Sequence, residues 1–118
     1  MKILSATLLI FLSCLSVKKE GSVAYIILEH SFNDQRVEIY VDNKKIYDEF
    51  VTTDPSLSVA DEHKITSIKG KHKLKVKVGK FEKTVVLNAD ELPEIYFGVR
   101  LYENWLIVHK YIKPPIYD

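Results

Sequence analysis

Five lysines at alternate positions form the most regular chemical pattern in the sequence: Lys69, Lys71, Lys73, Lys75 and Lys77. Alternate residues of a β-strand point to one side of the sheet, roughly 7 Å apart, so the pattern predicts a row of ammonium groups, here called the lysine ridge. Such a ridge could hold anionic headgroups, an acidic polysaccharide or an acidic partner. It could equally be a solvated face whose lysines guard a sheet edge, with Glu82 neutralising one end.

A second pattern is aromatic and lies near the C-terminus. Residues 94–102 and 105–112 are predicted to form a hairpin around Glu103-Asn104. If Val99 and Val108 face the core, the outward residues include Tyr96, Arg100, Tyr102, Trp105, Ile107 and Tyr111. Aromatic side chains with an arginine are typical of a protein interface or a sugar-stacking platform. We take Tyr96, Arg100, Tyr102, Trp105 and Tyr111 as candidate binding residues. The alternative is structural: the first strand covers this side, or a bulge turns the residues inward.

The sequence lacks the patterns that support catalysis or metal binding. Its four histidines come from different segments without His-x-x-x-His spacing. Acidic residues in predicted loops lack the dense Asp-x-Asp-x-Asp pattern of a calcium loop. The chain contains no Gly-x-Ser-x-Gly elbow or Gly-rich phosphate loop, and its single cysteine, Cys14, lies in an N-terminal apolar run. We therefore predict no catalytic residue, no metal site and no cofactor.

The first twenty residues have the order of an export signal. Lys2 supplies a positive charge, residues 3–15 are mostly apolar, and residues 18–22 are polar or small. This run is too short to cross a bilayer as a helix, which takes roughly 20 residues. A cleaved signal is therefore favoured over a retained transmembrane anchor.

The end of this run carries a resemblance. Phe11-Leu12-Ser13-Cys14 resembles the lipobox of bacterial lipoproteins, in the relaxed form of Bacteroidetes-type bacteria. It departs from the commoner pattern at Phe11 and Leu12. The resemblance implies that Cys14 is acylated and begins the mature chain, and a thioether-linked lipid plus an amide-linked acyl chain would supply the two chains that stable anchoring needs.

These observations divide the chain into a signal peptide, a lipid-anchored tether and a folded domain, which span residues 1–13, 14–22 and 23–118. The alternative is cleavage after Ser16, which discards Cys14 and releases a secreted protein. Removal of residues 1–13 takes Lys2 from the 17 basic residues and leaves 16 basic and 16 acidic ones. This neutral balance argues against nucleic-acid binding.

Alternation and short turns from residue 23 onward predict an all-β domain. We expect a small two-sheet antiparallel β-sandwich of seven to eight strands, Ig-like or transthyretin-like. Residues 23–28 predict a central strand, and residues 52–63 a connection between the sheets. A turn at Asn43-Lys44 would place Val37 opposite Phe50, Val41 opposite Ile46, and Tyr40 opposite Tyr47 as an outward pair. A turn at Gly79-Lys80 would place Leu74 opposite Val85, Val78 opposite Phe81, and Lys77 opposite Glu82, with Lys83 at a bulge or sheet edge.

Two stretches of the domain carry a second resemblance. Residues 37–44 (VEIYVDNK) and 69–76 (KGKHKLKV) are similar to surface β modules of the PEGA or transthyretin-like kind. They depart from those modules at Asn43, where Gly is usual. The resemblance implies a non-catalytic β module.

Together these features predict an exported, lipid-anchored, non-catalytic β-sandwich of the cell envelope that binds a protein or glycan, or serves as a structural module. Its membrane attachment would pass through Cys14. The alternative is a freely secreted structural module whose lysine ridge holds an acidic surface.

Overall fold

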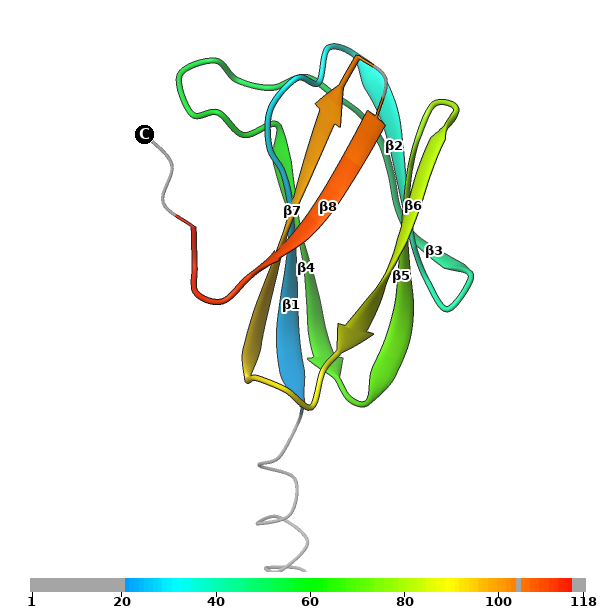
Figure 1. Cartoon of the computed structure of the whole chain (residues 1–118), viewed down its shortest axis with the longest axis vertical. Helices are drawn as coiled ribbons and strands as arrows, with labels where there is room; N and C mark the ends of the chain where they lie inside the picture. Colours follow the sequence, from blue (N-terminus) through cyan, green and yellow to red (C-terminus); the bar gives the residue numbers. More distant parts are fainter. Residues whose placement is uncertain (1–20, 104, 116–118) are drawn as a thin grey trace, which may run out of the picture.

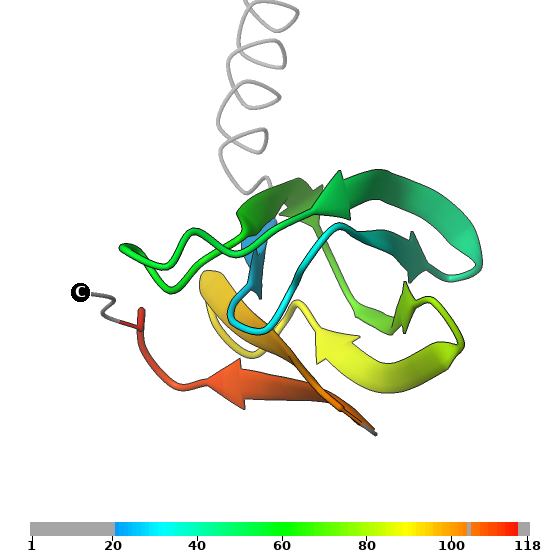
Figure 2. The same cartoon turned by 90° about the horizontal axis from the view of Figure 1, so that it is seen from above.

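The computed structural model describes residues 21–103 and 105–115, which contain eight β-strands and no helix. The strands are β1 (Ser22–Leu28), β2 (Gln35–Val41), β3 (Lys44–Val51), β4 (Asp61–Ile68), β5 (Lys71–Val78), β6 (Phe81–Asn88), β7 (Glu94–Tyr102) and β8 (Trp105–Tyr111). They form two sheets, with the orders β4-β1-β7-β8 and β3-β2-β5-β6. The sheets lie side by side as two layers, so the predicted all-β sandwich is confirmed (Figure 1, Figure 2).

The core fills the space between the two layers, because alternate residues of most strands are apolar and point inward. The first sheet contributes Ile26, Leu28 and Val99, and the second contributes Ile39 and Leu74, all without solvent exposure. Every second residue of β1, β5 and β7 follows this rule. The intervening residues form the outer faces of the sheets, on which both candidate sites lie.

One strand pair departs from the antiparallel arrangement that we predict. Strands β1 and β7 are parallel, with Val23 opposite Glu94 and Leu28 opposite Val99. A parallel pair needs a long crossover connection, and here β2 to β6 provide it through the second sheet and β4. A parallel pair has no short turn between its strands, so the alternation of apolar residues in the sequence could not reveal that β1 pairs with β7.

The two later hairpins have the predicted registers. Leu74 lies opposite Val85 and Lys77 opposite Glu82 around a turn where Gly79 has a φ of 57°. Tyr102 lies opposite Trp105, and Val99 opposite Val108. Strand β6 is an edge strand, which accounts for the exposed Lys83 at a position of inward parity.

The register of the first hairpin is wrong in the prediction. The turn falls at Asp42-Asn43, both with positive φ, rather than at Asn43-Lys44. A bulge then shifts the pairing so that Val41 lies opposite Lys44 but Ile39 lies opposite Tyr47. Tyr47 therefore points into the core, only 9% exposed, instead of pairing outward with Tyr40. Asp and Asn both tolerate positive φ, whereas a type I′ turn at Asn43-Lys44 would require it of Lys44, so the observed turn has the lower local cost.

Strand β4, which the sequence does not indicate clearly, begins inside residues 52–63, the segment that we expect to be a connection. It is an edge strand beside β1, and most of its residues are exposed. An exposed edge needs no alternation of apolar residues, so its sequence carries a weak signal. Tyr47 bridges from the opposite sheet to this strand by donating a hydrogen bond of 2.5 Å to Asp61 and packing against the ring of His63.

The folded domain begins one residue earlier than predicted. Ser22 is buried in β1, and its hydroxyl donates to the backbone oxygens of Ala89 and Leu92. Ser22 is therefore part of the sandwich and not of a tether. The predicted signal peptide and Cys14 lie outside the described residues.

Candidate functional site

All five candidate binding residues lie on the outer face of the sheet β4-β1-β7-β8. We call this surface the aromatic face; its members are Tyr25, Ile27, Glu29, Tyr96, Gly98, Arg100, Tyr102, Trp105, Ile107, His109 and Tyr111. Val99 and Val108 point into the core, as the outward assignment of their neighbours requires. The residues come from β1, β7 and β8, except Glu29, which directly follows β1.

Strand pairing arranges this face in rows. One row runs across all four strands as Lys64, Tyr25, Tyr96 and Tyr111. The Tyr25 and Tyr96 rings stack with centroids 4.8 Å apart and planes 6° apart, and the Lys64 ammonium lies 5.8 Å from the Tyr25 ring centre. The rings therefore stand against one another. One face of each ring is covered by the other ring, and the Tyr25 hydroxyl donates a hydrogen bond of 3.3 Å to Glu94.

A buried carboxylate holds the middle of the aromatic face together. Glu29 is 0% exposed, although it lies on the outer side of the sheet. Its Oε1 accepts hydrogen bonds from Arg100 Nε at 2.8 Å and His109 Nε2 at 3.0 Å, and its Oε2 accepts one from the Tyr111 hydroxyl at 2.5 Å. Arg100 also donates to the Tyr111 oxygen at 3.3 Å. These four residues, here called the Glu29 cluster, tie β1 to β7 and β8.

Gly98 provides the space for this cluster. A Cβ atom at Gly98 would lie 2.6 Å from Glu29 Oε1, 2.7 Å from His109 Nε2 and 2.8 Å from Tyr111 Cε2. All three distances are shorter than side-chain carbons tolerate. The bare backbone thus allows Glu29 to reach across β7 to β8, which explains a glycine in the middle of a strand.

The electrostatics of the cluster favour a fixed Arg100. Its hydrogen bond to Glu29 raises the pKa of the Arg100 guanidinium above its ordinary value. A charged hydrogen bond of this kind is among the stronger ones in proteins. Glu29, His109 and Tyr111 are residue types used in acid–base chemistry, but the carboxylate has no solvent exposure and is covered by its own partners. The cluster therefore acts as a positioning device for Arg100 and Tyr111.

The hairpin end of the aromatic face is the part most open to solvent. Trp105 is 65% exposed and lies opposite Tyr102, which is 41% exposed. Neither residue belongs to the core. The first strand does not cover the outward side, because β1 lies beside β7 in the same sheet; only the Glu29 side chain, which follows β1, lies over Gly98.

The lysine ridge lies on the outer face of the other sheet, with one exception. Lys69 precedes β5 in the β4–β5 turn, so four lysines rather than five share the strand. Lys75 lies over the Tyr40 ring at 4.6 Å from its centre, and Lys77 sits between Glu38 and Glu82 in the ladder. Lys71 and Lys73 are more exposed. The ammonium groups of Lys75 and Lys77 thus have aromatic or acidic neighbours within their own sheet.

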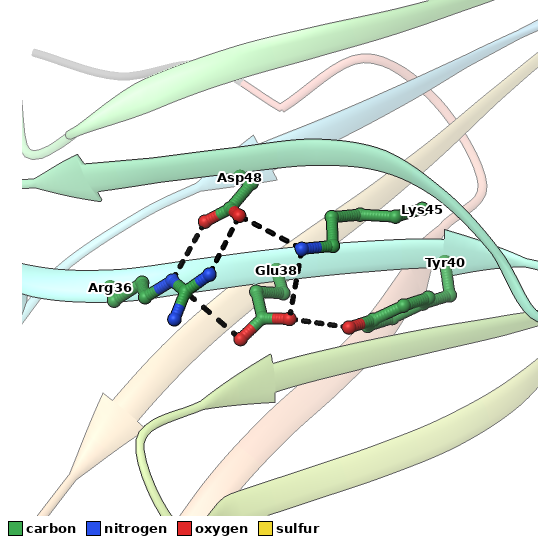
Figure 3. Close-up of polar contacts among 5 residues, drawn as sticks. All are labelled: Arg36, Glu38, Tyr40, Lys45 and Asp48. Atoms are coloured by element: carbon green, nitrogen blue, oxygen red, sulfur yellow. Dashed lines mark hydrogen bonds and ion pairs between the residues drawn. The ribbon is translucent and has the colours of Figure 1, made fainter.

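A network of five exposed or half-buried side chains flanks the ridge (Figure 3). Arg36 donates two hydrogen bonds to Asp48, at 2.9 and 2.8 Å, and Lys45 donates a third at 3.0 Å. Glu38 lies 3.7 Å from both cations and accepts a hydrogen bond from the Tyr40 hydroxyl. These contacts lower the pKa of Asp48, mainly through Arg36, and that of Glu38, mainly through Tyr40.

A histidine–aspartate pair closes one end of the same sheet. His72 Nδ1 lies 2.5 Å from Asp42 Oδ2, and its Nε2 lies 2.5 Å from the Lys69 carbonyl oxygen. Both ring nitrogens thus face acceptors, which favours the doubly protonated ring. The pKa of His72 is accordingly raised by its hydrogen bond to Asp42, and the pKa of Asp42 is lowered by the same bond.

Within residues 21–103 and 105–115, no group of three or more His, Cys, Asp or Glu side chains is arranged to hold a metal ion. The same part of the chain has no helix long and apolar enough to cross a membrane.

No family model, curated protein or solved structure matches this chain. The resemblances to bacterial lipoproteins and to PEGA or transthyretin-like modules therefore stay predictions. The functional argument rests on the geometry of the chain itself.

Sequence reasoning missed Glu29 and its contacts to His109 and Tyr111. Strand parity contained part of the signal, because Tyr25, Ile27 and Glu29 continue one face of the first strand. His109 likewise alternates with Ile107 and Tyr111. The missing step was the placement of β1 beside β7, which brings Glu29 to Arg100.

Proposed function

We propose that this protein is an exported, lipid-anchored, non-catalytic module of the cell envelope that binds a protein partner on its aromatic face. The observation that carries the binding part is the exposed end of that face, where Trp105 and Tyr102 stand beside a guanidinium fixed by buried Glu29. Tryptophan, tyrosine and arginine are the residues that dominate binding energy at protein interfaces.

The geometry of the tyrosine row favours a protein over a glycan. Sugar stacking needs an aromatic ring whose face is free, and the stack of Tyr25 on Tyr96 covers one face of each ring, so this row offers a sugar less open ring surface than separate rings would. Hydroxyl groups, ring edges and a fixed arginine provide the mixed polar and apolar contacts of a protein interface. The experiment below must therefore distinguish a protein partner from a glycan.

The absence of solvent exposure at Glu29 supports a binding role over catalysis. A general acid or base has to come within hydrogen-bond reach of the substrate. Glu29 is enclosed by Arg100, His109 and Tyr111, so a substrate cannot contact it without breaking the cluster.

The export and anchoring part rests on the leader and the lipobox-like Phe11-Leu12-Ser13-Cys14. We expect the protein, expressed in a bacterium with its own leader, to have the intact mass of a chain that starts at Cys14 and carries acyl groups. The Cys14→Ser variant should lose the acyl mass. A mature chain that starts near Val17 without added mass would contradict anchoring and leave a secreted protein.

The binding part can be tested by photocrosslinking in the protein's own cells. A benzophenone amino acid replaces Trp105 in one variant and Phe50 in a matched control, since Phe50 is 68% exposed on the other sheet. We expect a discrete adduct of higher mass only from position 105, and peptides of a second protein in its tryptic digest. An adduct whose added mass is removed by glycosidase, with no second protein in the digest, would identify a glycan instead. Equal adducts from both positions would refute a specific face.

A further inference from the structure

A pocket of about 470 Å³ opens at the end of the sandwich that lies opposite the start of β1. Strand β1 enters at the bottom of Figure 1, whereas the β5–β6 and β7–β8 turns lie at the top. The pocket lies between these two turns, and Val78, Phe81, Leu101 and Tyr102 provide its apolar wall. Its volume falls within the range of ligand pockets, roughly 300–1,000 Å³.

The walls of the pocket are held in place before any ligand arrives. The β5–β6 turn is a tight two-residue turn with Gly79 at positive φ. The β1–β2 loop, which contributes Ser31, is pinned by Phe32, a core residue only 3% exposed. Phe32 N donates to Thr53 Oγ1 at 3.1 Å, and Thr53 N donates to the Phe32 oxygen at 2.9 Å. Ser31 itself has a φ of 74°, an uncommon conformation that costs energy outside glycine.

The rim of the pocket carries charges of opposite sign. Lys80 lies on the β5–β6 turn with its ammonium 5.5 Å from the centre of the Phe81 ring, and Glu103 follows β7 on the other side. Neither forms an ion pair within the part of the chain that the structure describes. An apolar floor with a rim that offers both a cation and an anion matches a side chain flanked by peptide groups, whose NH and C=O have opposite polarity.

The pocket is continuous with the aromatic face. Tyr102 lines the pocket and also lies opposite the exposed Trp105 in the β7–β8 hairpin. A partner seated on the aromatic face could therefore extend a segment over the hairpin end and into the pocket. Buried anchors surrounded by polar contacts are the usual arrangement at protein interfaces.

From these observations we propose that the pocket receives one aromatic or branched aliphatic side chain from an extended segment of the protein partner, with the peptide groups of that segment between Lys80 and Glu103. This inference rests on the proposed function for the existence of a partner. It adds the location and the chemistry of the anchor residue.

The test uses the full mature chain in lipid nanodiscs, so that no detergent competes for the pocket. The probe is N-acetyl-tryptophanamide, which carries a large apolar side chain and a peptide group on each side. Methyl NMR spectra should show saturable shifts at Val78 and Leu101, with a dissociation constant of about 1 mM. N-acetyl-leucinamide should bind at the same methyls, and N-acetyl-alaninamide should cause no saturable shift.

Two matched variants make the test specific. Tyr102→Ala removes one wall of the pocket from an exposed position, and we expect it to weaken binding of the tryptophan probe by about fivefold. Phe50→Ala removes an exposed ring from the other sheet and should leave binding unchanged. Equal shifts at Val86, which is 64% exposed and outside the pocket, would indicate adsorption and overturn the proposal.

Further outcomes distinguish this inference from the proposed function. Absence of saturable shifts, together with a Trp105 crosslink, would overturn the pocket and leave the aromatic face as the binding surface. Tighter binding of decanoate than of the tryptophan probe would overturn the peptide assignment in favour of a free lipid chain. Saturable shifts that require Tyr102 would support the anchor site.

Discussion

The outer faces of the two sheets hold the same chemical groups in different surroundings. On the aromatic face, Glu29 accepts hydrogen bonds from an arginine and a tyrosine while 0% exposed. On the opposite face, Asp48 accepts from Arg36, and Glu38 accepts from Tyr40, but the Asp48 side chain is 31% exposed and that of Arg36 49% (Figure 3). The contact distances are similar, and burial is the difference.

This difference decides what each network can do. Exposed ion pairs gain little, because water and salt screen them and the long side chains lose freedom. A buried carboxylate is costly unless all its partners remain, so it holds the surrounding side chains in one arrangement. The Glu29 cluster can therefore position Arg100 and Tyr111 for binding, whereas the exposed contacts of the Arg36 network contribute little to stability.

The largest expected effect on stability is that of replacing Arg100, compared with the same replacement of Arg36 on the opposite face. Arg100→Met leaves Glu29 buried with one partner fewer and should lower the free energy of unfolding by about 3 kcal/mol. Arg36→Met, the matched control, leaves Asp48 in contact with water and Lys45 and should cause a several-fold smaller loss. Urea denaturation at neutral pH measures both variants. Equal losses would show that burial does not separate the two faces.

A methyl group at Gly98 should also destabilise the protein. Gly98→Ala pushes against Glu29, His109 and Tyr111, and overpacking of this kind costs roughly 1–3 kcal/mol. The cost should fall when the substitution is combined with His109→Ala, because one of the three clashes is then removed. If urea denaturation shows that the losses in free energy of unfolding from the two substitutions simply add, Gly98 and His109 do not compete for the same space.

The charged face should respond to pH through His72. Its folded pKa is raised above the ordinary histidine value of 6.5 by Asp42, so its stabilising contribution is complete below that value and disappears as pH rises through the folded pKa. Asp42 has a lowered pKa, and its contribution disappears only in acid, below the ordinary aspartate pKa of 3.8. The stability difference between the natural chain and His72→Gln should therefore shrink as pH rises above 6.5. A difference that grows with pH would contradict the imidazolium–carboxylate pair.

The smallest effect on stability is expected at the exposed aromatic residues. Trp105→Ala and Phe50→Ala should each change the free energy of unfolding by only about 0.5 kcal/mol, because both rings are mostly solvent-exposed. Only Trp105→Ala should abolish co-purification of the partner that the crosslink from position 105 identifies. If Trp105→Ala unfolds the domain, Trp105 is part of the core and the site assignment is wrong.

Several parts of the fold could be predicted because they are local. The β5–β6 and β7–β8 hairpins have alternating strands on each side of a short turn, and that combination determines register. The outward assignment of Trp105 and Tyr102 followed directly. The β2–β3 hairpin was predicted wrongly because the turn lies at Asp42-Asn43, one residue before the position that we predict, and a bulge then shifts the pairing so that Tyr47 points inward. Strand β4 was not predicted in full, because an exposed edge strand has little alternation of apolar residues.

By itself the sequence determined the all-β class, the two later hairpins and the side of the sheet to which their residues point, since strand parity and turn residues are encoded over a few neighbouring positions. Only the tertiary structure decided that β1 lies parallel to β7. That placement brings Glu29 to Arg100, 71 positions away, over the bare backbone of Gly98. It likewise decided that three separate turns enclose a pocket. Contacts between distant segments depend on how the two sheets pack as a whole, and no short stretch of sequence encodes that packing.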